Sequence, residues 1–178
     1  MQNADIELTD VFIPENNRLE KSKDFPTGAG MILLHSRLCL AWMVCGIAAG
    51  AYEAALRYTM QRTQFGKPIA GFQLTQKKLA EMLTEITKAQ LLAWKVGKMM
   101  NEGTAKTVHI SMAKRNNVEM AINIAREARQ IHGGMGITGE YPIMRHMMNL
   151  ESVLTYEGTH DIHLLILGNE ITGIQAFK

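Results

Sequence analysis

Cysteine is scarce in this sequence, and so are runs of like charge. The 178 residues include only two cysteines, which is too few for a disulfide framework or a cysteine-based zinc site. We interpret Cys39 and Cys45 as small core residues of a protein in a reducing compartment. The 19 basic and 17 acidic residues leave a net charge of +2 and form no block of one sign. We therefore expect no nucleic acid partner and no membrane-surface patch.

The sequence also lacks an obvious membrane span or leader. The uncharged stretch at residues 38–52 falls short of the roughly 20 residues needed to cross a bilayer, and Arg37 and Glu53 close its ends. It predicts a buried helix without membrane insertion, whose small residues would let another helix or subunit approach closely. The first residues contain neither the basic nor the apolar region of a secretory signal, so none is expected.

Helical periodicity is abundant. With 47% apolar and 20% charged residues, the composition is that of an ordinary globular domain. Apolar side chains recur at helical spacing in four stretches, at residues 28–61, 71–102, 105–131 and 161–176. Residues 143–156 could add a short fifth helix. This pattern predicts an all-α fold, an up-and-down four-helix bundle, over residues 27–178.

The residues before the bundle have a different pattern. Residues 5–14 alternate and then turn at Pro14, as in a short strand, and residues 15–30 are polar and rich in turn formers. We predict a short N-terminal strand or linker over residues 1–26.

The segment TYEGTHDIH, residues 155–163, poses the question of what Glu157 does. Glu157 and His160 have the Glu-x-x-His spacing of di-iron carboxylate bundles, but such sites need two of these pairs and two further glutamates. No metal site is predicted here. The glycines of HGGMG, residues 132–136, are also found in esterase oxyanion loops, but the required G-x-S-x-G motif is absent. They predict a helix stop whose backbone can approach another group closely.

The segment QRTQFGKPIAGFQ, residues 61–73, is the other informative stretch. Arg62 offers a planar fork of donors suited to a phosphate, and Phe65 offers an apolar plate. Taken alone, each is more typical of a solvated helix end or a core residue.

Three separated motifs together carry more information than each alone. RTQFGKPIAGFQ, QIHGGMGI and YEGTHDIHLLILG resemble, in order and spacing, the carboxy-terminal helical domain of the acyl-CoA dehydrogenase superfamily. The phrases QKKLAEMLTEI, KRNN, RHMMNLE and TYEGTHDIH most resemble its glutaryl-CoA dehydrogenase branch. The resemblance covers residues 9–178 and implies FAD as cofactor and an acyl-CoA thioester as substrate.

The resemblance implies FAD contacts from two parts of the chain. Arg62, Gln64 and Phe65 match the motif that contacts the pyrophosphate and adenosine part of an FAD held mainly by a neighbouring subunit. Gln130 and Gly134 match residues that serve the same end of that cofactor through side chain and backbone.

The subunit's own FAD would meet the start of the last helix. Thr159 and Asp161 match positions that contact it there, and the free N–H groups of a helix amino terminus suit a pyrophosphate. A carboxylate at Asp161 would repel phosphate unless it caps the helix.

Glu157 matches the general base of the family. This base removes the α-proton of the acyl-CoA while hydride leaves the β-carbon for the flavin, and the product is a trans-2-enoyl-CoA. Arg37 matches an arginine near the CoA thioester, Tyr156 would supply a dry wall, and Gly158 would allow close approach of substrate and flavin. In the glutaryl branch the product also loses carbon dioxide to give crotonyl-CoA.

Subunits of the family are roughly twice as long, with an amino-terminal helical domain and a middle β-domain. The resemblance therefore implies that residues 1–26 are the end of a β-domain and a linker, and that this chain is a fragment with little activity alone. It further implies a homotetramer, electron-transfer flavoprotein as electron acceptor, and a cytoplasmic (bacterial) or mitochondrial matrix location.

Two other functions remain open. One is a short-chain acyl-CoA dehydrogenase or an oxidase of the same superfamily, and the other is a non-catalytic helical oligomerisation domain. A yellow purified protein would argue against the last, and rapid recovery of reduced flavin in air would indicate an oxidase.

Overall fold

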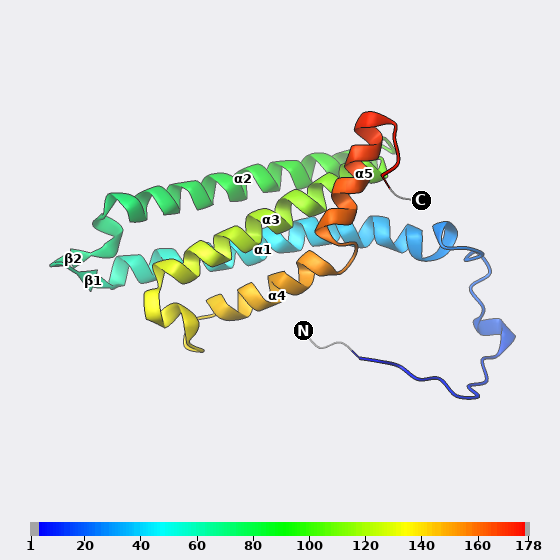
Figure 1. Ribbon diagram of the computed structural model, residues 1–178, viewed down its shortest axis with the longest axis horizontal. Coiled ribbons are helices and arrows are strands. Elements are labelled where there is room, and N and C mark those ends of the chain that lie inside the picture. Colours follow the sequence, from blue (N-terminus) through cyan, green and yellow to red (C-terminus); the bar gives the residue numbers. More distant parts are fainter. Residues whose placement is uncertain (1–3, 177–178) are drawn as a thin grey trace.

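The computed structural model describes residues 4–176, and nearly all regular structure in this part of the chain is helical (Figure 1). The expected all-α fold is confirmed. The longer helices are α1 (Met31–Gln61), α2 (Gln73–Asn101), α3 (Thr107–Ile131), α4 (Ile143–Thr155) and α5 (His160–Thr172). The shorter elements are η1 (Glu15–Asn17), η2 (Pro26–Gly30), β1 (Thr63–Gln64), β2 (Lys67–Pro68), η3 (Ile69–Gly71) and η4 (Gly133–Ile137).

Helices α1, α2 and α3 run side by side, and α4 lies alongside α1 and α3 as the fourth member of the bundle (Figure 1). The sequence pattern assigned that place to residues 161–176, with 143–156 as a possible extra helix. In the structure α5 instead crosses the end of α3. The reason is the distribution of apolar side chains, because α4 buries Ile143, Leu150 and Val153, whereas the only fully buried side chain of α5 is His163.

Helix α1 is apolar along most of its length. By length and composition alone, Pro26–Gln61 could cross a membrane, a property that the core helix of a bundle also has. Its small side chains Ala41, Ala48, Ala51 and Ala55 are fully buried. Because they are small, the backbone of α1 can approach the neighbouring helices closely.

Helix α3 lies at the centre of the bundle and contacts α1, α2, α4 and α5. Its buried stripe is apolar with a few polar exceptions, of which Asn117 joins three helices. The Asn117 Nδ2 donates hydrogen bonds to the carbonyl oxygens of Ala41 in α1 and Ala89 in α2, each at 3.0 Å. A buried amide with satisfied donors fixes the relative position of the helices that it joins.

The strand predicted at residues 5–14 is absent from the structure. Residues 4–14 form no helix or strand, and every residue from 4 to 27 is exposed. A strand needs a partner edge for its backbone hydrogen bonds, and none of the described residues provides one for this segment. The assignment of residues 1–26 to the end of a β-domain and a linker stays a prediction.

Aromatic rings pack together where the glycine-rich segment leaves the end of α3. His132 is buried and stacks on Tyr58 with ring centroids 4.4 Å apart, and Tyr141 meets the His132 ring at 4.8 Å. The His132 Nδ1 donates a hydrogen bond to the Ala128 carbonyl oxygen at 2.7 Å. Burial lowers the pKa of His132, so the ring is neutral in the folded protein at neutral pH.

We expect Asn117→Ala to lower the free energy of unfolding by about 1–3 kcal/mol, because it removes two buried hydrogen bonds between helices. Urea denaturation of the chain measures this change. Asn123, exposed on the same helix, provides the control: Asn123→Ala should change the free energy by less than about 0.5 kcal/mol. Equal effects of the two substitutions would contradict the role of Asn117.

We expect acid to destabilise the fold through His132. The pKa of His132 is lower in the folded state than the ordinary value of 6.5, so below that pH the unfolded state binds more protons and the free energy of unfolding falls. His132→Phe keeps a ring against Tyr58 but removes the titrating group. Urea unfolding at about pH 7.5 and 5.5 should show a smaller loss in the variant than in the wild type; equal losses would refute the assignment.

Candidate functional site

Glu157 lies in the turn between α4 and α5. Its backbone has φ 62°, and Gly158 follows with φ 91°, so two consecutive residues are in the left-handed region. Such a conformation is uncommon for a residue with a side chain and persists only where its surroundings hold it. The contacts around the turn should therefore include the groups that hold it.

Two adjacent residues of α1 contact Glu157. The Ser36 hydroxyl donates a hydrogen bond to Glu157 Oε2 at 2.8 Å, and Arg37 Nε donates one to the Glu157 carbonyl oxygen at 2.8 Å. Glu157 itself is half-buried. One side chain of α1 therefore orients the carboxylate, and the next one holds the backbone. The structure places Arg37, expected near the thioester, directly against the predicted base.

Two buried titratable side chains lie beneath the turn. Lys114 of α3 is 1% exposed, and its ammonium donates a hydrogen bond to the Gly158 carbonyl oxygen at 2.8 Å. Burial, and then the charge of Arg37, lower the pKa of Lys114 to about 8, while the Glu157 carboxylate opposes this shift. His163 of α5 is fully buried, and burial followed by the charges of Lys114 and Arg37 lowers its pKa to about 4. At neutral pH the histidine is therefore uncharged.

Gly158 is required by the space around it as well as by its φ. A β-carbon at this position would lie 3.0 Å from His163 Nε2 and 3.2 Å from Arg37 Nη2. Any side chain here would push apart the groups that surround the turn. The predicted role of Gly158 in close approach stays a prediction, but a side chain here would be strained by the left-handed backbone and would require His163 and Arg37 to shift.

Tyr156 precedes the turn and is half-buried against the core of the bundle. Burial, and then the nearby Glu157 carboxylate, raise the pKa of the Tyr156 hydroxyl. The ring is thus a neighbour of Glu157, and its predicted role as a wall that limits water stays a prediction.

The start of α5 forms a shallow hollow of about 410 Å³ that Thr159, His160 and Asp161 line together with residues of α3 and α4. Thr159 Oγ1 accepts a hydrogen bond from the Ile162 N–H at 3.3 Å, so Thr159 is the cap. Asp161 is therefore not the cap that the sequence allowed it to be, and it lies exposed in the first turn. His160 approaches Glu119 at 3.7 Å. Residues 4–176 contain no cluster of side chains that could hold a metal ion.

A second group of predicted residues lies beyond the carboxy-terminal end of α1. Strands β1 and β2 form a small hairpin with Phe65 and Gly66 at its tip, at φ 52° and 80°. The left-handed conformation at both positions gives the tight turn between the strands. Phe65 is 91% exposed, and its ring meets that of Phe72 edge-on with centroids 6.1 Å apart. Its role as a plate for a bound group stays a prediction.

Arg62 and Gln64 line a hollow of about 480 Å³ together with Gly134 and its neighbour Gly133. The structure therefore brings together two motifs that are far apart in the sequence. Gln130 is not part of this hollow, because its side-chain oxygen accepts a hydrogen bond from Lys78 of α2.

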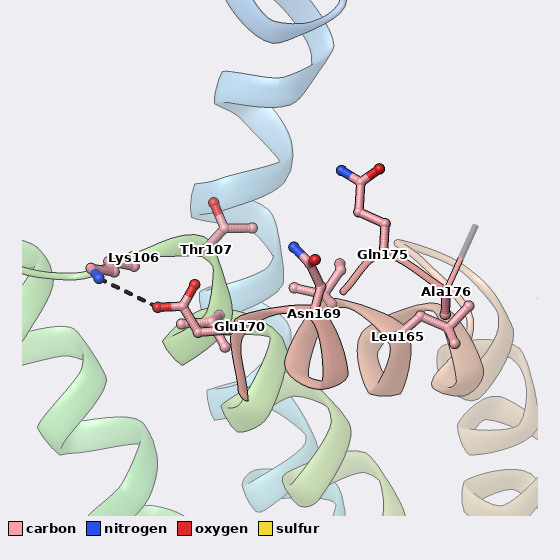
Figure 2. A pocket seen from close by; sticks show the side chains of 9 residues that line it. Lys106, Thr107, Leu165, Asn169, Glu170, Gln175 and Ala176 are labelled. Carbon is pink, nitrogen blue, oxygen red and sulfur yellow. Dashed lines mark hydrogen bonds and ion pairs between the residues drawn. The ribbon is translucent and has the colours of Figure 1, made fainter. Parts of the chain in front are cut away.

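The two groups of residues lie far apart along the bundle. Lys114, under the Glu157 turn, is in the first half of α3, and Gln130 is its penultimate residue. At about 1.5 Å per residue they are roughly 24 Å apart along the helix. A third hollow, of about 420 Å³, lies between α3 and α5 beside the Lys106–Glu170 ion pair (Figure 2). None of the predicted site residues lines it.

The sequence interpretation missed Ser36, Lys114 and His163. Lys114 carried a signal, because a lysine four residues after Ile110 falls on the apolar stripe of α3. Ser36 carried none, since its contact with Glu157 spans 121 residues of chain.

Known proteins are similar to this chain in sequence and in fold. The family model "Acyl-CoA dehydrogenase, C-terminal domain" matches residues 28–172. A short-chain-specific acyl-CoA dehydrogenase from Megasphaera elsdenii is 37% identical over 96% of this chain and 44% of its own length. A caffeyl-CoA reductase–Etf complex subunit from Acetobacterium woodii is 36% identical over 92% of this chain and 43% of its own length.

The solved structures agree with this assignment. Glutaryl-CoA dehydrogenase from Mycobacterium smegmatis matches with a TM-score of 0.81 and 49% identity over 83% of this chain and 38% of that one. Another glutaryl-CoA dehydrogenase structure from that organism, in complex with FADH2, matches with a TM-score of 0.80 and 45% identity over 82% of this chain and 38% of that one. The chain spans less than half the length of these relatives. It belongs to the acyl-CoA dehydrogenase family, of which it contains the C-terminal helical domain.

Proposed function

We propose that this chain is the C-terminal domain of an FAD-dependent acyl-CoA dehydrogenase in which Glu157 is the catalytic base. The observation that carries the proposal is a half-buried carboxylate in a left-handed turn, oriented by Ser36 and held through its backbone by Arg37. Such a group, held in one place beside an apolar ring, is suited to abstract a weakly acidic proton. As a helical oligomerisation domain, the chain would have no use for these contacts.

The base would act through one particular oxygen. Ser36 occupies Oε2, and no described residue is hydrogen-bonded to Oε1. Oε1 would take the α-proton of the acyl-CoA, while the β-carbon loses a hydride and the double bond forms between the two carbons. When bound, FAD supplies the acceptor for that hydride.

The described residues offer two places suited to the phosphates of such a cofactor. Arg62 offers exposed guanidinium donors in the hollow that it shares with Gly134. The amino terminus of α5 offers free N–H groups beside Thr159, although the exposed carboxylate of Asp161, which does not cap the helix, opposes a phosphate there. Because the two places are remote from each other, we propose that they serve two different FAD molecules in a homo-oligomer, which the resemblance to the family implies is a tetramer.

The names of the relatives support a proposed substrate and a proposed electron acceptor. The match to glutaryl-CoA dehydrogenase supports glutaryl-CoA as substrate, with decarboxylation to crotonyl-CoA. The match to a short-chain-specific enzyme supports a short acyl-CoA as the second candidate. The similarity to a subunit of an Etf complex supports electron-transfer flavoprotein as the acceptor. Further domains would complete the site, so this chain alone is expected to be inactive.

Glu157→Gln tests the base. The amide oxygen can still accept from Ser36, but it cannot take a proton, so acyl-CoA dehydrogenation by the full-length FAD-loaded protein should fall by about 10²–10⁴-fold. Turnover with glutaryl-CoA and butyryl-CoA is measured with a dye as electron acceptor. Glu151→Gln, an exposed change on α4, should retain activity. An active Glu157→Gln enzyme would refute the role.

Arg62→Ala tests the second flavin contact. Loss of a charge-assisted hydrogen bond, worth about 1.5–3 kcal/mol, should weaken FAD binding by about 10–100-fold. Titration with FAD and gel filtration of the protein show affinity and whether flavin travels with an oligomer. Arg57→Ala removes an exposed arginine of α1 paired with Glu53 and should leave the affinity unchanged. Equal flavin retention in both variants would exclude Arg62 as a contact.

A further inference from the structure

Lys114 is the most deeply buried charged side chain among the described residues. It is 1% exposed and lies on the core stripe of α3, close to Ala113 and Asn117. A buried ammonium is costly unless a well-placed acceptor compensates for the lost water. Its acceptor is the Gly158 carbonyl oxygen, 2.8 Å away, in the turn that carries Glu157.

Two cations hold two consecutive carbonyl groups of this turn. Arg37 of α1 donates to the oxygen of Glu157, and Lys114 of α3 donates to that of Gly158. The two residues whose carbonyls are held, Glu157 and Gly158, are the left-handed residues of this turn. Fixing both carbonyls from different helices fixes the rotation of the turn, and with it the direction of the Glu157 side chain.

We propose that Lys114 is a positioning residue for the catalytic base, and that its buried ammonium keeps the Glu157 carboxylate on Ser36 by holding the Gly158 carbonyl. The proposal rests on the proposed function of Glu157 for its effect on catalysis. The contact itself does not depend on that function.

The charges around the turn indicate that Lys114 holds the turn by its hydrogen bond and does not only fill space in the core. Arg37 and Lys114 are cations that contact the turn, Glu157 is its carboxylate, and His163 beside them is kept neutral by burial and by the two cations. The charged or titratable groups further along are Tyr156, and His160 with its neighbours Arg115, Glu119 and Asp161. A methionine would fill the same volume on the core stripe without the cost of a buried charge. What methionine cannot do is donate a hydrogen bond to Gly158.

The prediction concerns Lys114→Met in the full-length FAD-loaded protein. The freed turn should let the carboxylate leave its position, so kcat for acyl-CoA should fall by about 10²-fold while KM and flavin content stay within about threefold. Amide hydrogen exchange at residues 155–162 should accelerate by about tenfold, and exchange in the cores of α1, α2 and α3 should not change. Lys95→Met, at an exposed lysine of α2, is the matched control.

If Lys114→Met does not fold, a second variant, Lys114→Arg, tests the same proposal. Lys114→Arg keeps the cation but changes the position of the donor, so kcat should fall with KM unchanged, and exchange should accelerate only at the turn. Unchanged kcat and exchange would overturn the proposal, and so would faster exchange throughout the helices, which indicates a packing role. If the wild type itself dehydrogenates no acyl-CoA, the proposed function fails, and the exchange measurement still decides whether Lys114 anchors the turn.

Discussion

The candidate site depends on one constraint, which is that a glutamate must stay in a left-handed conformation. The chain meets this constraint with charge-assisted hydrogen bonds to consecutive backbone carbonyls, from Arg37 on α1 and Lys114 on α3. Such bonds are about twice as strong as neutral ones. Ser36 can orient the carboxylate only because the backbone beneath it is already fixed.

The bundle supplies the rigidity that these bonds need. Asn117 lies one turn after Lys114 on α3 and ties that helix to α1 and α2. The donors of Arg37 and Lys114 are therefore held at a fixed distance by a buried amide nearby. In this part of the molecule, the contacts that stabilise the fold and those that position Glu157 lie on the same helix.

Much of this arrangement could be predicted from the sequence. The helices follow from apolar periodicity, and the motif around Glu157 identified the turn. The packing of α5 could not be predicted, since a short, evenly apolar helix does not indicate which face will be buried. The contacts of Ser36 and Lys114 could not be predicted either, although the place of Lys114 on the apolar stripe of α3 indicated that it is buried. Each depends on a partner distant in the chain, and a lysine in a helix is usually solvated.

The backbone of Glu157 limits how far this domain could be stabilised by engineering. A glycine would relieve the left-handed strain at position 157, and a search guided only by thermostability would favour it. The same exchange removes the carboxylate. The left-handed strain is thus the cost of keeping the side chain that we propose as the base, and gains in melting temperature that preserve it have to come from elsewhere, such as the exposed faces of α2.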